Sequence, residues 1–341
     1  MSEWMIYGAN GYTGELIARE AARLGLAPVL AGRNAERIRA LAAELRLESR
    51  VFDVGAPQLS GISLVLHCAG PFSRTSRPMV DACVAQGAHY LDITGEIPVF
   101  EAIMAHHDEA KSRGVTLLPG VGFDVVPTDC LAAMLAQKMP AATELWLAFY
   151  ARGSTLSRGT LRTMLDGIGQ GGAVRRDGRI IRVPPAYDAR EIPFSCGARM
   201  AMTIPWGDVS TAFHTTGIPD VRVYAAAHPK RIARLRRYAK FLPLLARPPL
   251  RPLLGFFADR KQGPTQAMRK SARTFLWGRV EDSEGNELTM TMSTPEPYAL
   301  TVSSALAAVE RVLREPVQGG SFTPAKRFGA RFVLGLPGVE L

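Results

Sequence analysis

A glycine-rich stretch near the amino terminus constrains what this chain can fold into more than any other part of it. Gly8, Gly11 and Gly14 follow the short apolar run Trp4 to Tyr7, which is typical of a buried strand. They precede residues 15–24, whose apolar side chains recur at helical spacing. A strand, a glycine turn and a helix in this order predict a dinucleotide site. Its glycines allow the tight turn, the close approach of a pyrophosphate and the close packing of the helix. The alternative is an ordinary glycine turn between a strand and a helix.

The rest of the amino-terminal part alternates between apolar runs and helical patterns. Further strands are predicted at residues 28–33, 50–54, 63–68, 89–96 (a strand with its turn) and 115–118, and helices at residues 35–45, 78–86 and 98–113. This alternation predicts an α/β fold with a Rossmann-type doubly wound parallel sheet and helices on both faces. Ligands of such sheets bind beyond the carboxyl ends of the strands, so we expect the turn residues to line one edge for cofactor and substrate.

The end of the second predicted strand bears on the type of cofactor. Arg33 stands where an NAD-preferring site would place an Asp or Glu for the ribose 2′-hydroxyl. A guanidinium can bind a 2′-phosphate through two hydrogen bonds, so Arg33 favours NADP(H); the alternative is a solvated arginine at a helix start. Asn34 is expected to cap the next helix, and Asp53 ends a strand that commonly flanks the adenine. The predicted cofactor-binding residues are Gly8, Asn10, Gly11, Tyr12, Thr13, Gly14, Arg33, Asn34, Asp53, Cys68, Ala69, Gly70 and Pro71.

Four residues at or near strand ends are weaker candidates for substrate contact. Thr94 and Glu96 follow the fifth predicted strand, and Asp124 follows the sixth. Asp124 is the one expected to face the substrate, although a role as a helix cap near Pro127 explains it equally well. Arg152 either pairs with a substrate carboxylate or phosphate or is solvated. The sequence contains no convincing Ser-His-Asp order, catalytic carboxylate pair or metal-ligand spacing, so it predicts no metal site and leaves the catalytic residue unidentified.

The second half of the chain predicts a separate α+β domain with a mainly antiparallel sheet. Short runs that predict strands lie at residues 144–151, 200–204, 211–216 and 221–226, hairpins are predicted at 173–183 and 273–292, and a helix at 160–168. A long helix over residues 297–314 has small side chains on one face. We therefore expect an NADP-binding Rossmann domain at residues 1–125, an α+β substrate or dimerisation domain at 126–296, and a C-terminal helix and tail at 297–341 that return to the first domain.

One segment supplies nearly all of the net charge of +10. Residues 228–261 carry ten basic side chains and one acidic one, whereas residues 1–130 are net negative. Basic and apolar side chains fall on opposite sides of a helix that starts near residue 230, and a proline-broken apolar stretch follows to residue 257. This pattern is typical of an interfacial membrane helix. It also suits docking of an acidic acyl carrier or an acyl-CoA phosphate, and a surface helix with solvated arginines is the simplest account. Because the charge is local and aromatic residues are sparse, nucleic acid is not expected as a partner.

The remaining composition predicts a cytoplasmic protein without a signal peptide or a membrane span. The four cysteines form no C-x-x-C pair and are expected to be free thiols in a reducing compartment. No apolar run reaches the roughly 18 residues of a membrane span, and no signal peptide precedes the first strand. Peripheral contact with a membrane through residues 228–257 is compatible with that location.

Five motifs follow one another in the first 129 residues. They are Gly-Ala-Asn-Gly-Tyr-Thr-Gly at 8–14, Leu-Ala-Gly-Arg-Asn at 30–34, Cys-Ala-Gly-Pro-Phe at 68–72, Tyr-Leu-Asp-Ile-Thr-Gly-Glu at 90–96 and Pro-Gly-Val-Gly-Phe-Asp-Val-Val-Pro-Thr-Asp at 119–129. Together they resemble the saccharopine dehydrogenase-like oxidoreductases, a family with a branch of bacterial trans-acting enoyl reductases, and the resemblance recurs at residues 204–208. It implies an NADP-binding Rossmann domain, a second α+β domain inserted before a returning C-terminal segment, and membership of an oxidoreductase family.

Two hypotheses for function follow. The first is an NADP(H)-dependent oxidoreductase that transfers a hydride to a C=C or C=N bond of an acyl or amino-acid-like substrate. The alternative is a non-catalytic NADP-binding module that uses residues 228–257 to engage a membrane or a carrier protein. The expected partners are a small-molecule substrate and a second copy of the chain in a homodimer.

Overall fold

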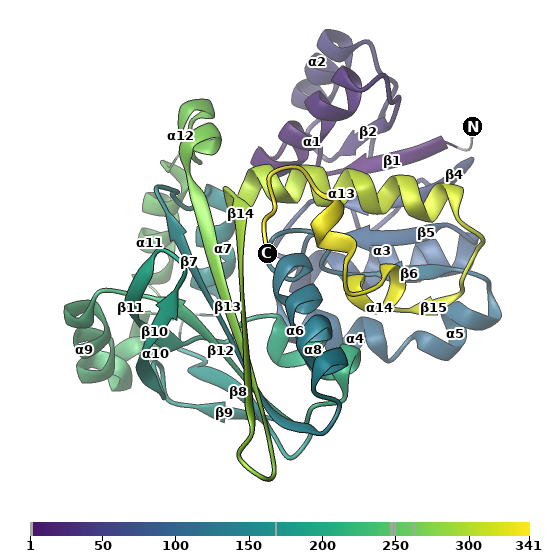
Figure 1. The fold of residues 1–341 in the computed structure, drawn as a ribbon. Helices are drawn as coiled ribbons and strands as arrows, with labels where there is room; N and C mark the ends of the chain where they lie inside the picture. Colours follow the sequence, from purple (N-terminus) through teal and green to yellow (C-terminus); the bar gives the residue numbers. More distant parts are fainter. Residues whose placement is uncertain (1–2, 168, 246–247, 249, 262) are drawn as a thin grey trace. The chain divides into compact units, whose positions relative to one another are not determined.

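The computed structural model describes residues 3–167, 169–245, 248, 250–261 and 263–341 (Figure 1). The chain divides into two compact units. The first comprises Met1–Phe123 and Leu300–Pro324, and the second comprises Asp124–Ala299 and Ala325–Leu341. The C-terminal segment was expected to return to the first unit as a whole, but residues 325–341 group with the second unit.

The first unit is built on a seven-stranded sheet in which every neighbouring pair is parallel. Its strands are β1 (Glu3–Tyr7), β2 (Val29–Gly32), β3 (Ser49–Val51), β4 (Ile62–His67), β5 (His89–Asp92), β6 (Thr116–Leu118) and β15 (Gly320–Ser321). They lie in the order β15-β6-β5-β4-β1-β2-β3, so the chain changes direction across the sheet between β1 and β4. This is the strand order of a Rossmann fold, and the predicted fold class is confirmed. The two-residue strand β15 was not predicted.

Six helices accompany this sheet among the described residues. They are α1 (Tyr12–Arg23), α2 (Ala35–Leu45), α3 (Phe72–Gln86), α4 (Ile97–Met104), α5 (His107–Ser112) and α13 (Pro297–Arg314), the last from Leu300 onward. The single helix predicted over residues 98–113 is two helices. α3 begins six residues before Pro78, where its start was predicted, so that this proline lies inside the helix.

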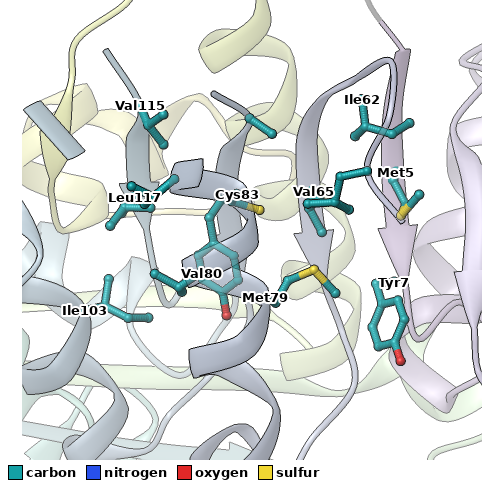
Figure 2. Packing of buried hydrophobic residues seen from close by; sticks show 14 of the residues in the cluster. Met5, Tyr7, Ile62, Val65, Met79, Val80, Cys83, Ile103, Val115 and Leu117 are labelled. Carbon is teal, nitrogen blue, oxygen red and sulfur yellow. The ribbon is translucent and has the colours of Figure 1, made fainter. Parts of the chain in front are cut away.

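The core of the first unit lies between the sheet and α3 (Figure 2). Met79 and Cys83 of α3 pack with Met5 and Val65 of the two central strands, and all four are buried. Ile6, which points to the opposite face of β1, is also fully buried. Both faces of the sheet are therefore covered, as a parallel sheet requires.

The second unit is built on a mixed sheet. Its strands are β7 (Ala142–Arg152), β8 (Gly172–Arg176), β9 (Arg179–Val183), β10 (Ala189–Phe194), β11 (Gly197–Thr203), β12 (Asp220–Ala226), β13 (Arg273–Asp282) and β14 (Glu287–Pro295). The main path runs β10-β11-β12-β7-β13-β14, and β8 joins β12 to β9. The β7–β12 pair is parallel and the other described pairs are antiparallel, which confirms a mainly antiparallel sheet. Both predicted hairpins form, and Asp177 and Gly178 both have positive φ in the tight turn between β8 and β9.

One strand prediction in the second unit is wrong. Residues 211–216 belong to helix α8 (Asp208–Thr216), which ends at Gly217 with a φ of +77°. Five consecutive residues of this helix, from Asp208 to Ala212, are buried. A strand with one solvated face would bury only alternate residues, so this burial does not fit the predicted strand. Strand β10 was not predicted, because its sequence lacks a clear alternation.

The other helices of the second unit cover its sheet or extend from it. They are α6 (Val126–Lys138), α7 (Arg158–Asp166), α9 (Pro229–Tyr238), η1 (Ala239–Phe241), α10 (Leu242–Leu245), α11 (Leu250–Asp259), α12 (Gln266–Ser271), α14 (Pro324–Phe328, from Ala325) and η2 (Phe332–Gly335). Residue 168, the predicted end of α7, and residues 246, 247 and 249 of the basic segment lie outside the described residues. Among the described helices, none combines the length and the apolar character needed to cross a membrane.

Candidate functional site

The glycine turn between β1 and α1 is shaped by close backbone contacts. Gly8 has a φ of +84°, and a Cβ atom there would lie 2.8 Å from the Cβ of Ala69. A Cβ atom on Gly14 would overlap the carbonyl oxygen of Gly8. Around Gly11, by contrast, the nearest described atom to such a Cβ is the Gly8 carbonyl oxygen at 3.2 Å. The turn is thus closed on the strand and helix sides, whereas a Cβ atom on its middle glycine would have one close described neighbour, the Gly8 carbonyl oxygen.

The amino terminus of α1 begins at this middle glycine. Gly11 is the N-cap, with extended backbone at φ −81° and ψ 163°, and no side chain of the described chain caps it. The first turn of a helix carries N–H groups without intrahelical partners and a partial positive charge. An uncapped helix start beside a glycine turn is therefore suited to hold the pyrophosphate of a dinucleotide.

Two charged residues lie near the carboxyl end of β1. The Tyr7 hydroxyl donates to the Phe52 carbonyl oxygen at 3.3 Å. The pKa of Tyr7 is raised to about 12, chiefly by burial and also by the Asp53 carboxylate, whereas the Arg33 guanidinium acts to lower it. Arg33 is exposed directly after β2. The structure therefore brings Arg33 and Asp53 to the same edge of the sheet, where the adenosine end of a cofactor would lie.

The amide and carboxylate at this edge have local structural partners. Asn34 caps α2 as predicted, because its side chain accepts the Arg37 N–H at 3.0 Å. Asp53 accepts the Gly55 N–H at 2.9 Å, which closes the turn after β3. Their contact with a cofactor stays a prediction.

The turn after β4 forms the next part of the edge. Cys68 donates its N–H to the Tyr7 carbonyl oxygen at 2.8 Å, and Gly70 is exposed before a cis peptide bond to Pro71. Burial raises the pKa of the Cys68 thiol well above its usual range, with a further contribution from Asp92. The Cys68 thiol is therefore neutral at physiological pH, and its contact with a cofactor stays a prediction.

Thr94 and Glu96 shape the turn after β5. The Glu96 carboxylate accepts the N–H groups of Phe72 at 2.7 Å and Ser73 at 3.0 Å, so it caps the start of α3. Thr94 is fully buried, and its hydroxyl oxygen accepts the Glu96 N–H at 3.1 Å. Both side chains thus have structural roles, and their assignment to the substrate stays a prediction.

Two buried titratable residues beneath this edge were not predicted as site residues. Asp92, at the end of β5, accepts the Tyr90 hydroxyl at 2.8 Å and the backbone N–H groups of Thr94 and Gly120. Burial raises the pKa of Asp92 to about 6. Burial lowers the pKa of His67 to about 4, so this imidazole is neutral beneath the turn. The signal that could have identified both residues in the sequence is a titratable side chain at the end of an otherwise apolar strand.

Asp124 opens the second unit without capping its first helix. The N-cap of α6 is Val125 and no side chain of the described chain bonds there, so the helix-cap alternative is wrong. Asp124 is half-buried, and burial raises its pKa to about 7. It lies near Asp208, a fully buried carboxyl that accepts the Thr128 hydroxyl at 2.8 Å. Asp124 can thus hold or release a proton near neutral pH.

Two other features of the second unit bear on ligand binding. Arg152 is exposed, with its guanidinium carbon 5.1 Å from the centre of the Phe275 ring. A cavity of about 590 Å³ is lined by Asp188, Arg190, Glu191, Pro193, Trp277 and Arg279, among others. The sequence analysis did not identify this cavity, because its lining comes from strands far apart in the chain. Within the described chain, no three His, Cys, Asp or Glu side chains are arranged to hold a metal ion.

The parallel strand order and the uncapped glycine turn define the first unit as a Rossmann-type dinucleotide-binding domain. Residues 4–118 match the family model described as the saccharopine dehydrogenase NADP binding domain. The resemblance to the saccharopine dehydrogenase-like oxidoreductases stated from the motifs is confirmed, and the matched domain supports a nicotinamide cofactor.

Curated relatives show the same resemblance, and a solved structure shares the fold. A human saccharopine dehydrogenase-like oxidoreductase is 24% identical, over 95% of this chain and 92% of the relative. A trans-acting enoyl reductase of Mycobacterium leprae is 34% identical, over 37% of this chain and 33% of the relative. The structure of saccharopine dehydrogenase (L-Glu forming) from Saccharomyces cerevisiae covers 98% of this chain and 96% of its own, with a TM-score of 0.66 at 11% identity, and so shares the fold.

Proposed function

We propose that this protein is an NADP(H)-dependent oxidoreductase that transfers a hydride to a C=C or C=N bond of an acyl or amino-acid-like substrate. The observation that carries the proposal is the uncapped start of α1 beside Gly11, within a domain that matches an NADP-binding family. The cofactor supplies the hydride chemistry, and the chain's own task is to bind, orient and handle one proton.

The preference for NADP(H) over NAD(H) rests on Arg33. Its guanidinium is exposed after β2 and forms no ion pair with a described residue, so it is available to a 2′-phosphate. A guanidinium and a phosphate form short charge-assisted hydrogen bonds. Asp53 is also close to this edge, but no acidic residue follows Gly32 at the position where NAD-preferring sites hold the ribose hydroxyls.

Asp124 is the candidate source of the proton. Reduction of a C=C or C=N bond adds a hydride to one atom and a proton to the other. A carboxyl group whose pKa burial raises to about 7 carries that proton at neutral pH and can release it. The glycine and apolar residues around it, from Gly120 to Val125, are buried, which limits access of water to this carboxyl.

The experiment is a turnover assay with the purified full chain and NADPH. Oxidation of NADPH is followed by its near-ultraviolet absorbance with two substrate panels: α,β-unsaturated acyl thioesters, and imines formed from an amino acid and an oxo acid. Turnover with one panel assigns the bond that is reduced. NADPH binding without turnover in either panel contradicts the enzyme proposal and supports the non-catalytic alternative. The homodimer stays a prediction, which light scattering tests on the same sample.

We also propose a peripheral membrane location, in place of the simplest account of the basic segment as a solvated helix. The observation that favours it is the exposure of large apolar side chains among the cations of α9–α11. An acyl carrier remains the competing partner, and the test below distinguishes the two.

A further inference from the structure

Exposed apolar side chains gather in one part of the second unit. Eleven large apolar side chains are exposed in the described chain. Eight of them lie on or beside α7 and the α9–α11 segment: Leu156, Met164, Tyr187, Tyr238, Phe241, Leu244, Phe256 and Phe257. α10 contacts both η1 and α11, and α11 packs on α7, so the segment is continuous (Figure 1). Such a concentration marks an interaction surface, since single exposed apolar residues are normally scattered.

The segment is anchored to the second unit by its other face. Ile232 of α9 is buried, and Leu235 and Leu242 are half-buried. The Arg236 guanidinium donates to the Ala186 carbonyl oxygen at 2.8 Å. The Arg251 side chain of α11 pairs with a carboxylate at the end of α7. Ile232, Leu235 and Leu242 of the apolar stripe predicted for this helix therefore pack inward, whereas Tyr238 of the same stripe stays exposed with the other rings of the segment.

The exposed rings are interleaved with cations that lack anionic partners. Lys230, Arg231, Arg234, Arg237, Lys240, Arg260 and Lys261 are exposed and form no ion pair with a described residue. Three of these cations lie close to the exposed rings. The Lys240 ammonium is 5.2 Å from the centre of the Phe241 ring, and the Arg260 guanidinium carbon is 4.1 Å from that of Phe256. The Arg237 guanidinium carbon is 6.0 Å from the centre of the Tyr238 ring, so Tyr238, Phe241 and Phe256 each lie beside a positive charge at the surface.

We define the basic aromatic surface as these seven cations with Tyr238, Phe241, Leu244, Phe256 and Phe257, and we propose that it docks on an anionic membrane surface. Aromatic and leucine side chains that are about half exposed can enter the boundary between headgroups and acyl chains. The neighbouring Lys and Arg then remain level with the lipid phosphates. The inference does not depend on the proposed enzyme activity.

The chemistry favours a lipid surface over an acidic protein. An acidic carrier domain would account for the cations but would not need five apolar side chains spread among them over several short helices. A membrane can bind apolar side chains that are distributed over several helices, because the lipid interface adapts to their positions and no complementary groove is needed.

The test is flotation of the full-length protein with two kinds of vesicle, phosphatidylcholine alone and phosphatidylcholine mixed with phosphatidylglycerol. We expect binding to the anionic vesicles at low ionic strength, weak binding to the neutral ones, and release by salt. Arg234→Gln with Arg237→Gln should reduce partitioning roughly tenfold or more, since each cation near such a surface contributes about a fivefold factor. Phe256→Ser with Phe257→Ser should reduce it independently and also at low salt.

Matched variants separate docking from general charge or hydrophobicity. Lys111→Gln with Arg113→Gln removes two exposed cations from the first unit, and Val317→Ser removes an exposed apolar side chain there. Both controls should bind anionic vesicles as the native protein does, and all variants should keep native circular dichroism and NADPH affinity. Absence of flotation with anionic vesicles at low salt overturns the proposal. So does flotation that the two surface variants leave unchanged, or binding to an acidic acyl carrier in the absence of vesicle binding.

Discussion

Replacement of Arg33 by glutamine tests the cofactor preference most directly. The side chain is exposed and forms no ion pair within the described residues, so its loss should change the free energy of unfolding by less than about 0.5 kcal/mol. Hydrogen bonds to charged groups contribute about 1.5–3 kcal/mol, so the variant should bind NADPH roughly 10- to 150-fold more weakly. NADH lacks the 2′-phosphate, and its affinity should stay within about twofold of the native value, because the glycine turn that holds the pyrophosphate is untouched.

The assay is calorimetric titration of native and variant protein with both cofactors at two salt concentrations. The native preference for NADPH should shrink as salt rises, because the contact is exposed to solvent. Arg39→Gln, which removes an exposed arginine within α2, is the matched control and should leave the affinities for both cofactors unchanged. An equal loss of NADPH and NADH affinity in Arg33→Gln would refute the reasoning, as would native protein that binds NADH as tightly as NADPH.

Three further substitutions test other parts of the structure. Gly14→Ala places a methyl group against the Gly8 carbonyl oxygen, so it should lower the free energy of unfolding by about 1–3 kcal/mol and weaken the binding of NADPH and NADH equally. Urea unfolding measures the first effect and cofactor titration the second. Native affinity for both cofactors would contradict the prediction. For Asp124, whose pKa burial raises to about 7, the protonated form is lost as pH rises through 7, so native turnover should fall above that pH. Asp124→Asn should turn over slowly with no such titration while binding NADPH normally, and a native pH–rate profile would argue against the proton assignment. For His67, whose pKa burial lowers from 6.5 to about 4, the unfolded chain binds a proton that the folded chain does not between those pH values. Its contribution to stability should therefore fall by about 3 kcal/mol as pH drops from 6.5 to 4, and His67→Phe should remove that dependence from the stability–pH curve.

The first domain could be predicted from sequence because its signals lie in consecutive residues. The spacing of Gly8, Gly11 and Gly14 between a strand and a helix predicts a tight turn with close backbone packing. The structure shows both features, in the positive φ of Gly8 and in the close approach of Gly14 to the Gly8 carbonyl oxygen. Most of the parallel strands are buried and consist of continuous apolar runs, so the six strands from β1 to β6 could be predicted from the order of residues along the chain. The asparagine cap of α2 was predicted because a cap and its helix are adjacent in the chain.

Contacts between distant residues decided what the sequence left open. α3 starts at Phe72, ahead of Pro78, because the Glu96 carboxylate, 24 residues away in sequence, binds its first N–H groups. Residues 211–216 are helical because tertiary packing buries that side of the second unit, which outweighs the β-propensity of threonine.

The same division holds for the site and the surface. The sequence by itself determined a nucleotide-binding turn with an arginine nearby, because each of these is a property of one short stretch. Only the tertiary structure decided that Asp124 is partly desolvated without capping a helix, and that one apolar set of the basic segment packs inward while another stays exposed. Burial depends on which remote residues surround a side chain, and periodicity along the chain does not carry that information.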